Sequence, residues 1–331
     1  MLNAAIVGLG WWGRIIVQTM AASDRLRITA ATDLDPSAAS FAAAHGLRFQ
    51  PNLPVLLADP TIEAVILCTP HTQHAAQVVA AAEAGKHVFC EKPLCLTRAD
   101  AMAAIAACVA HDVVLGVGHE RHFEPPVVAL RQLAESGALG TLLQVEANFS
   151  QDKFLGLPPG NWRLSGNEAP AGPMTATGIH MLDLSVSLLG PADRVLAHVR
   201  QLGSDLANGD TLGLLIGFQS GANALISAIL ATPFDGRFAL YGSNGWAEVR
   251  DRAHPEAPQG WTLTTSLRGA GRAVTDYPLA FAVRTNLEAF AEAARGGAPY
   301  PLPHAQMLDT IAALEAVVRS AASGGIERVM S

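Results

Sequence analysis

The sequence predicts an α/β domain built on a doubly wound parallel sheet, followed by an α+β domain built on an antiparallel sheet. Over about the first 120 of the 331 residues, short apolar runs alternate with helix-like segments, which is typical of a parallel sheet covered on both faces. Beyond His119, runs of alternating apolar and polar residues are separated by turn-forming dipeptides, which predicts hairpins. We expect the first domain at residues 1–121 and the second at 122–331, with a last helix that can pack back on the first domain.

The first domain is expected to contain six strand–helix units. Gly46 and Gly85 are each expected to end a helix, and a capping box from Thr97 to Asp100 is expected to begin a long one. The expected strands are the apolar runs at 4–7, 27–32, 47–49, 64–68, 86–90 and 113–117.

The first strand runs directly into the glycine turn Gly8-Leu9-Gly10-Trp11-Trp12-Gly13, and a helix follows. In that context the pattern indicates dinucleotide binding and a Rossmann domain. Gly8 would form the tight turn, Gly10 would let the backbone approach a pyrophosphate, and Gly13 would let helix and strand pack closely. The pyrophosphate would lie at the positive end of the helix dipole. The alternative is an ordinary turn in a glycine-rich protein.

Asp33 ends the second expected strand, 20 residues after Gly13. An acidic residue at that distance is expected to bind the hydroxyls of the adenosine ribose. Because a carboxylate repels a 2′-phosphate, Asp33 favours NAD over NADP. The alternative is that Asp33 only starts the loop before the next helix.

The second domain begins with a helix at 126–136 and a strand at 141–150, before an irregular segment at 151–173 and a helix at about 177–189. Turns are expected at Asn208-Gly209, Ser220-Gly221, Asp235-Gly236 and Asn244-Gly245. They separate expected strands at 194–202, 210–218, 222–231, 236–243, 246–250, 261–267 and 273–277, and helices near 285–295 and 304–322 end the domain.

Composition excludes several classes of protein. The formal net charge is −7 and no basic run is present, so nucleic acid and anionic membranes are not expected partners. The start of the chain has no basic region before its apolar residues and breaks into glycines, unlike a signal peptide. The four cysteines, Cys68, Cys90, Cys95 and Cys108, have no metal-ligand spacing, so we expect buried thiols, no metal site and a cytoplasmic protein.

In an open parallel sheet, ligands bind beyond the carboxyl ends of the strands. Three loops are therefore expected at the site: Gly8–Gly13, Thr69–His74 and Glu91–Leu94. Lys92 follows an apolar strand and precedes Pro93, and a proline there raises the chance of a cis bond. A lysine beside a nicotinamide can polarise a hydroxyl or carbonyl or share its proton. Alternatively, Lys92 is a surface lysine in a turn.

The ordered conjunction of motifs resembles the Gfo/Idh/MocA family of glucose–fructose oxidoreductase, inositol dehydrogenase and their relatives. The resemblance spans essentially the whole chain and rests on the glycine turn, Thr69-Pro70 with His74, Glu91-Lys92-Pro93, Arg121 to Pro125, Glu135 to Gly140, Trp162-Arg163 and Gly178 to Asp183. It implies a large, mostly antiparallel second sheet that commonly forms dimers or tetramers, and hydride transfer between a nicotinamide cofactor and a sugar, cyclitol or related alcohol or carbonyl.

By position, Lys92 matches the catalytic lysine of the family and His180 its active-site histidine. An imidazole titrates near neutrality and suits proton transfer; the alternative is a histidine at a helix start that backbone groups satisfy. Asp183 shares a helix face with His180, so it either orients the imidazole or has a structural role in the helix.

Substrate contacts are expected from His122, Trp162, Arg163 and Asp183. Arg163 offers a planar fork for a carboxylate or phosphate, or else pins its loop through a salt bridge. The expected cofactor-binding residues are Gly8, Gly10, Trp11, Trp12, Gly13, Asp33, Thr69, Pro70, His74, Glu91 and Lys92.

One position departs from the family. The usual aspartate four residues before the histidine is replaced by Ala176, and a methyl group cannot take a proton. This departure indicates altered chemistry, a different substrate class such as a carboxylated or cyclic diol, or weak activity. Glu120, His122, Lys153 and Asn161 are polar groups that could substitute.

The leading hypothesis is an NAD-dependent oxidoreductase acting on CH–OH groups of a small molecule, active as a homodimer or homotetramer. Two others stay open. A cofactor-binding regulator or sensor would bind NAD without turnover, and an NAD-assisted glycosidase would form product without net NADH.

Overall fold

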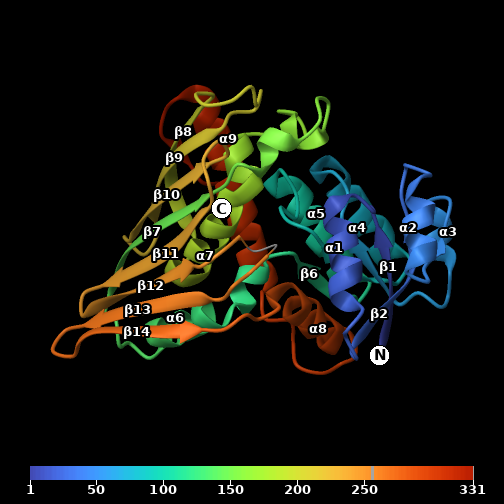
Figure 1. Ribbon diagram of the computed structural model, residues 1–331, viewed down its shortest axis with the longest axis horizontal. Coiled ribbons are helices and arrows are strands. Elements are labelled where there is room, and N and C mark those ends of the chain that lie inside the picture. The colour runs from blue at the N-terminus through green and yellow to red at the C-terminus, as the bar shows by residue number, and fades with distance from the viewer. Residues whose placement is uncertain (255–256, 331) are drawn as a thin grey trace. The chain divides into compact units, whose positions relative to one another are not determined.

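The computed structural model describes residues 1–254 and 257–330. Their contacts divide the chain into two compact units, and Figure 1 names the elements of each. The first unit consists of residues 1–120 and 281–307, and the second of residues 121–280 and the chain from Leu308 onward. The segment 281–307, expected from the sequence in the second domain, thus packs within the first unit.

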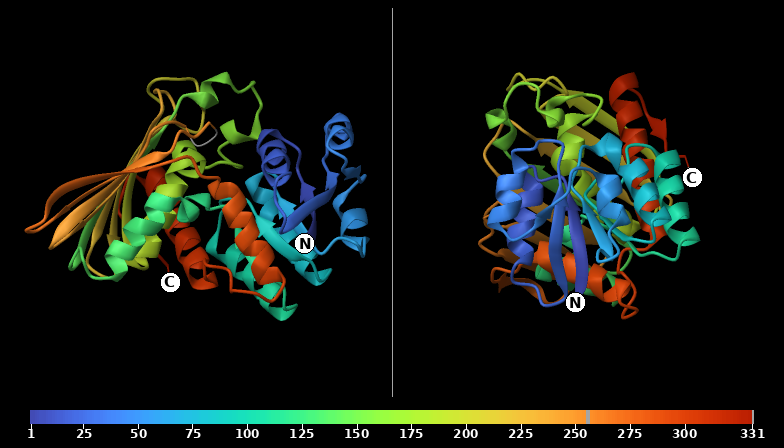
Figure 2. Two further views of the ribbon diagram at one scale, coloured as in Figure 1. Left: turned by 60° about the horizontal axis from the view of Figure 1, so that its bottom comes forward. Right: turned by 90° about the vertical axis from the view of Figure 1, so that its right-hand side faces the viewer.

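The first unit contains a six-stranded parallel sheet in the described part of the chain, with the order β3-β2-β1-β4-β5-β6. The sequence prediction of a doubly wound parallel sheet is confirmed, with helices on both faces (Figure 2). The strands are β1 (Leu2–Val7), β2 (Leu26–Thr32), β3 (Arg48–Phe49), β4 (Ala64–Leu67), β5 (His87–Cys90) and β6 (Leu115–Val117). The helices of its N-terminal part are α1 (Trp11–Met20), α2 (Ala38–Ala44), α3 (Leu53–Ala58), α4 (His74–Glu83) and α5 (Arg98–Ala110).

Helix α8 (Ala282–Ala294) completes the core of the first unit. The ring of Phe290 packs edge-on against Phe89 of β5, with ring centroids 5.6 Å apart. Asn286 donates to the carbonyl oxygen of Val117 at 3.0 Å, and the Tyr300 hydroxyl donates to the same oxygen at 3.0 Å. Burial of such an aromatic side chain contributes about 1.5–3 kcal/mol. These contacts therefore hold α8 in the first unit, although it follows the strands of the second unit in the chain.

The second unit contains a nine-stranded sheet in the described residues, with the order β14-β13-β12-β11-β7-β10-β9-β8-β15. All neighbouring strands are antiparallel except β7 and β10, which are parallel, so the mostly antiparallel sheet is confirmed. Its strands are β7 (Leu142–Ser150), β8 (Ala192–Arg200), β9 (Thr211–Phe218), β10 (Asn223–Ile229), β11 (Asp235–Gly242), β12 (Gly245–Asp251), β13 (Trp261–Leu267), β14 (Gly271–Tyr277) and β15 (Glu327–Arg328).

One expected hairpin is wrong. The sequence predicts a turn at Asp235-Gly236, but both residues lie inside β11, where Asp235 pairs with Ser150 of β7. β7 stands between β10 and β11 in the sheet, so the chain cannot join those two strands by a hairpin. Pairing with β7 therefore outweighs the local turn preference of the dipeptide.

Helices cover one face of this sheet (Figure 1). They are α6 (Pro125–Glu135), α7 (Ile179–Leu189) and the part of α9 (His304–Ser323) that belongs to this unit. The Ser320 hydroxyl, for example, accepts a hydrogen bond from the Ala197 N–H of β8 at 2.9 Å.

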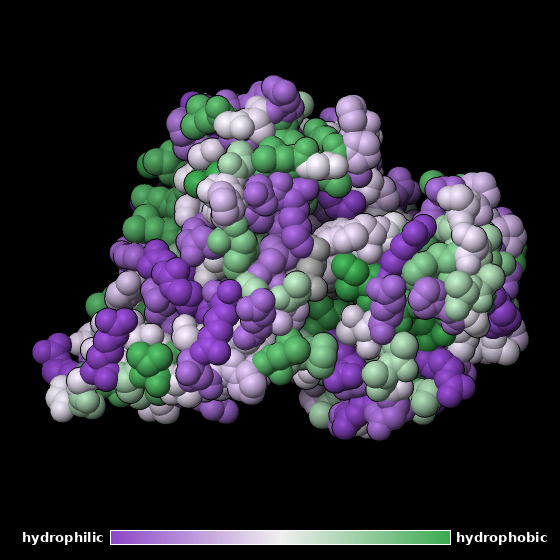
Figure 3. Space-filling model, viewed as in Figure 1, coloured by the Kyte–Doolittle hydropathy of each residue, from purple (hydrophilic) through white to green (hydrophobic). Residues whose placement is uncertain are grey.

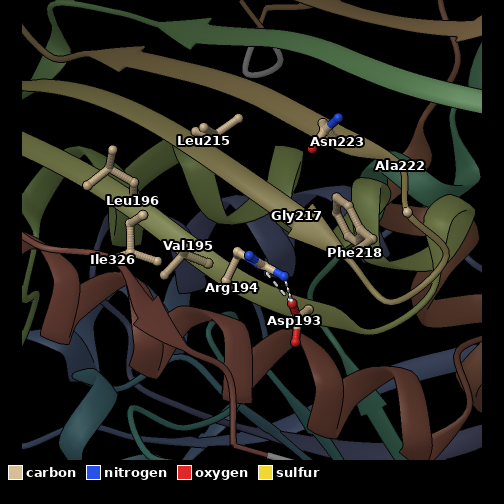
Figure 4. Close-up of a pocket in the computed structure, with 11 residues that line it drawn as sticks. Asp193, Arg194, Val195, Leu196, Leu215, Gly217, Phe218, Ala222, Asn223 and Ile326 are labelled. Carbon is tan, nitrogen blue, oxygen red and sulfur yellow. Dashed lines mark hydrogen bonds and ion pairs between the residues drawn. The ribbon is translucent and has the colours of Figure 1, made fainter.

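The opposite face of the sheet carries a row of exposed leucines. Leu196 of β8 pairs with Leu215 of β9, which pairs with Leu225 of β10, and their exposed fractions are 39%, 43% and 44%. Figure 3 shows hydrophobic surface at the margin where these strands lie. Leu196 and Leu215 also line a shallow pocket together with Phe218 and Ile326 (Figure 4).

Candidate functional site

The glycine turn begins directly after β1 and continues into the first residues of α1, as its sequence pattern predicts. Gly8 has φ +96°, and a Cβ there would lie 2.6 Å from the carbonyl oxygen of Cys68, so the turn requires glycine. A Cβ on Gly13 would lie 2.0 Å from the carbonyl oxygen of Gly8, whereas one on Gly10 would meet nothing within 4 Å. The three positions thus have the tight turn, the close helix packing and the open approach expected of a dinucleotide loop.

The N-terminus of α1 faces this turn, and within the described residues no side chain caps it. Arg14 Nε donates to the carbonyl oxygen of Leu9 at 2.9 Å, which holds the turn. Trp11 is 47% exposed, and its ring centroid is 5.6 Å from that of Trp12. A helix start of this kind attracts an anion through its backbone N–H groups and dipole, so the residues present fit the pyrophosphate of a dinucleotide.

Asp33 stands at the end of β2 and holds the glycine turn. Its carboxylate accepts the N–H of Leu9 at 2.5 Å and the N–H of Asp35 at 2.8 Å. Each carboxylate oxygen has two lone pairs, so the half-buried side chain keeps acceptor capacity for a ribose. The predicted ribose contact stays a prediction, and the structure adds a role in fixing the turn.

His74 ties together the loops that follow β4 and β5. Its side chain is fully buried, with Nδ1 2.8 Å from the carbonyl oxygen of Pro93 and Nε2 3.0 Å from the carbonyl oxygen of Thr69. Thr69 also donates to Gln77 Oε1 at 2.6 Å, and Pro70 precedes a short 3₁₀ turn. The three predicted loops therefore meet at the carboxyl edge of the first sheet, with His74 in a loop-positioning role.

Glu91 and Lys92 follow β5 at this edge, and the peptide bond between Lys92 and Pro93 is cis. Glu91 is buried, and its Oε2 accepts the backbone N–H of Lys92 at 3.2 Å. Burial, and next the negative charge of Glu120, raise the pKa of Glu91 to about 7, although Trp12 and Lys92 favour its ionised form. A carboxyl that titrates near neutrality at a strand end is characteristic of active sites.

Three of the four cysteines are not suited to nucleophilic or metal chemistry. Burial raises the pKa of Cys95 to about 12 and that of Cys108 to about 11, and raises the pKa of Cys90 well above its usual value. These thiols stay protonated at neutral pH. The described residues contain no group of three or more His, Cys, Asp or Glu side chains able to hold a metal ion.

In the second unit, His122 and Asp183 form a buried network with two further residues. Oδ2 of Asp183 binds Nε2 of His122, the Arg131 guanidinium binds Nδ1 of His122, and Thr310 donates to Oδ1 of Asp183 at 3.0 Å. Because arginine can only donate, Nδ1 of His122 accepts in that contact and Nε2 is left to donate to Asp183. Both oxygens of Asp183 are engaged here, which favours its structural role; substrate contact by either residue stays a prediction.

His180 is the second residue of α7 and is 5% exposed. One π-helical turn, Met174–Gly178, precedes the helix, and such turns are frequent at functional sites. Ala176 is the half-buried residue of this turn. The ring of His180 lies 5.8 Å from that of Phe149 on β7, centroid to centroid.

Phe149 in turn rests on a buried ion pair that the sequence did not reveal. The Arg121 guanidinium carbon lies 4.6 Å from its ring centroid. Arg121 binds Asp251 at 3.1 Å and Glu124 at 3.4 Å, and the Trp261 indole donates to Asp251 at 2.9 Å. Since Asp251 is far from Arg121 in the chain, no local pattern could have identified it.

Two further polar groups lie near this cluster. The Lys153 ammonium is 3.0 Å from Nδ1 of His254, whose Nε2 is hydrogen-bonded to Gln151. Burial, and then the charges of Lys153 and Arg121, lower the pKa of His254 to about 4, so this imidazole is neutral at physiological pH.

Arg163 lies over the ring of Trp162, its guanidinium carbon 4.2 Å from the ring centroid. The backbone of this turn is held by Asn161, which accepts the Arg163 N–H at 3.0 Å, and by Asn208, which donates to the Arg163 carbonyl oxygen at 2.9 Å. These amide contacts pin the loop, and the predicted substrate contacts of Trp162 and Arg163 stay predictions.

No described helix is long and apolar enough to cross a membrane.

Comparisons with known proteins agree with this architecture. Residues 2–119 match the model of an oxidoreductase family with an NAD-binding Rossmann fold, and residues 127–248 match the GFO/IDH/MocA C-terminal domain.

Three similar proteins are an inositol 2-dehydrogenase, an uncharacterized oxidoreductase and an aldose–aldose oxidoreductase. The inositol 2-dehydrogenase of Ralstonia nicotianae is 30% identical over 99% of this chain and 96% of its own. The uncharacterized oxidoreductase YrbE of Bacillus subtilis is 29% identical over 76% of this chain and 74% of its own. The crystal structure of the aldose–aldose oxidoreductase from Caulobacter crescentus, complexed with glycerol, superposes with a TM-score of 0.87 at 26% identity, covering 99% of each chain. The chain belongs to the GFO/IDH/MocA family of NAD(P)-dependent oxidoreductases.

Proposed function

We propose that this protein transfers a hydride between NAD and the CH–OH or carbonyl group of a sugar, a cyclitol or a related carboxylated diol. The observation that carries the proposal is the edge of the first sheet, where the glycine turn, Asp33 and the Lys92 loop meet. The glycine turn and the start of α1 would hold the pyrophosphate, and Asp33 would hold the adenosine ribose. Because a carboxylate repels a 2′-phosphate, we expect NAD to bind more tightly than NADP.

Lys92 and His180 are proposed to act at the reacting oxygen. Bound NAD would supply the hydride acceptor, while the Lys92 side chain orients and polarises the hydroxyl and His180 exchanges its proton. Phe149, supported by Arg121, would keep the imidazole in place. Arg163, held on Trp162, would bind a carboxylate or other polar group of the substrate, and His122 and Asp183 would shape that region.

The test is NADH-linked turnover on a panel of sugars, cyclitols and carboxylated diols, with NADH binding measured in parallel. We expect turnover with at least one member of the panel. Lys92→Met should lower it by roughly 10²- to 10⁴-fold, the range of general acid–base effects, and leave NADH affinity nearly unchanged. Full activity of that variant would refute the role of Lys92. NADH binding without turnover would favour a sensor, and product formed without net NADH would favour an NAD-assisted glycosidase.

The exposed leucine row supports a second proposal, that two copies of this chain pair through the outer face of the nine-stranded sheet to form a homodimer or homotetramer. Leu196, Leu215 and Leu225 form a contiguous apolar strip, and such strips mark interaction sites. Leu215→Glu places a charge in the middle of this strip, so the molar mass measured by light scattering should fall to that of a monomer. Leu202→Glu, at a 75% exposed leucine outside the strands, is the matched control, and a monomeric parent protein would contradict the proposal.

A further inference from the structure

Arg14 lies in the first turn of α1, directly after the glycine turn, and two contacts hold its guanidinium group. Its Nε donates to the carbonyl oxygen of Leu9 at 2.9 Å. Its guanidinium carbon lies 5.0 Å from the ring centroid of Phe41 in α2, within the range of a cation–π contact. Phe41 in turn packs against the core of the first unit and stacks on His45, with ring centroids 4.0 Å apart. The guanidinium group is therefore fixed, although Arg14 is an exposed residue.

Leu9, which binds Arg14, also binds Asp33. The Leu9 N–H donates to the Asp33 carboxylate at 2.5 Å, while the Leu9 carbonyl oxygen accepts from Arg14. One residue of the glycine turn thus has an anionic side chain on its N–H and a cationic side chain on its C=O. Both charges are fixed beside the strand end at which the adenosine ribose is expected to bind.

The acidic groups of the loop after β2 already have hydrogen-bond donors of their own. The two oxygens of Asp35 accept the N–H of Ser37 at 2.9 Å and its hydroxyl at 2.7 Å. These hydrogen bonds, and to a smaller extent the charge of Arg14, lower the pKa of Asp35, so the guanidinium lies close enough to act on this loop. In the part of the chain that the structure describes, the terminal nitrogens of Arg14 make no hydrogen bond or ion pair. They stay available as donors to a ligand.

We propose that Arg14 binds the 2′-phosphate of NADP, so that the chain carries a determinant for each cofactor and Asp33 alone makes NAD the preferred one. This inference rests on the proposed function, of which it refines the cofactor site. A guanidinium is always charged and offers paired N–H donors that match a phosphate, and an arginine near the ribose accommodates a 2′-phosphate in Rossmann folds. Since Asp33 repels the same phosphate, the cofactor preference is the difference between two opposing charges.

The first test uses two probes without a nicotinamide, adenosine 2′,5′-bisphosphate and adenosine 5′-monophosphate. Both are titrated calorimetrically into the full chain carrying Asp33→Asn, which lacks the repelling charge. Adding Arg14→Gln should weaken the bisphosphate about ten- to a hundredfold, the contribution of a hydrogen bond between charged groups, and the monophosphate less than about threefold. Adding Arg14→Lys, which keeps the charge, should preserve part of the bisphosphate affinity. Arg27→Gln, at an exposed arginine of β2, is the control and should change neither.

Equal losses for the two probes in Arg14→Gln would overturn the inference, because Arg14 would then only hold the glycine turn in shape. A bisphosphate affinity as low in Arg14→Lys as in Arg14→Gln would overturn it as well, because the charge would then not matter.

The second test compares NAD and NADP themselves by calorimetric titration. Asp33→Asn should raise the affinity for NADP relative to NAD, and adding Arg14→Gln should reverse that gain. The NADP affinity of Asp33→Asn should fall as NaCl is raised, because salt screens exposed charges, and Arg14→Gln should weaken this dependence. If both cofactors bind and the double variant keeps the gain, only the role of Arg14 is refuted. If neither cofactor binds the parent protein, the proposed function itself fails.

Discussion

The two units hold their candidate site residues by different means. In the first unit, backbone geometry sets the candidate residues: a glycine turn, strand ends, and two loops whose carbonyl oxygens both contact His74. In the second unit, buried side-chain pairs set the candidate residues: His122 with Asp183, and Arg121 with Asp251. The first arrangement suits a ligand that is recognised by shape and phosphate charge. The second suits precise placement of one imidazole, because each side chain is fixed by its neighbours.

The largest loss of activity is expected at His180, the one residue of the second unit that we propose at the reacting atoms. His180→Asn should lower kcat by roughly 10²- to 10⁴-fold, since it removes the group that exchanges the proton, and leave NADH affinity as in the parent. The measurement is steady-state kinetics beside a fluorescence titration with NADH. His198→Asn, at an exposed histidine of β8, is the control, and equal kinetics of the two variants would remove His180 from the chemistry.

A stability measurement tests whether buried side chains hold the second unit together. Asp251→Ala leaves the Arg121 guanidinium buried without its main anion, so the free energy of unfolding should fall by about 3–5 kcal/mol. Asp235→Ala removes an ion pair with Arg250 whose side chains are about half exposed, and should cost no more than about 1 kcal/mol. Chemical denaturation measures both. If Asp251→Ala lowers the free energy of unfolding no more than Asp235→Ala does, the buried ion pair of Arg121 does not stabilise the second unit.

In the first unit, the substitution Asp33→Asn should change the relative affinities for NAD and NADP. Asp33→Asn removes the charge that would bind the ribose diol and repel a 2′-phosphate. A hydrogen bond to a charged group contributes about 1.5–3 kcal/mol, so NAD affinity should fall by about ten- to a hundredfold and the preference over NADP should shrink. Calorimetric titration with both cofactors measures the ratio. Asp35→Asn is the control, and an unchanged ratio in Asp33→Asn would exclude the ribose contact.

The smallest expected effect is a gain at the π-helical turn. Ala176→Asp returns a carboxylate four residues before His180, and we expect turnover of simple polyols to rise by at least about tenfold, a part of the usual acid–base contribution. Ala176→Asn is the matched control without the charge. If polyol turnover does not rise, the missing carboxylate was not what limited that activity.

Sequence patterns predicted most of the first unit, because its functional geometry follows from local rules for glycine turns, strand ends and helix starts. The Thr97 side chain does cap α5 through the Asp100 N–H at 3.1 Å, and Gly8 has the positive φ its position requires. The sequence did not reveal Asp251, Thr310 or Gln151, because each joins the site across a long stretch of chain. The wrong turn at Asp235-Gly236 has the same origin: strand order in a sheet depends on distant partners.

The most direct test of the central claim is a crystal structure of the protein with NADH. We expect the pyrophosphate over the turn from Gly8 to Gly13, the adenosine ribose on Asp33, and the nicotinamide beside Lys92 with His180 within reach of the substrate oxygen. A nicotinamide far from Lys92, or a His180 imidazole that cannot approach it, would contradict the proposed roles of these two residues.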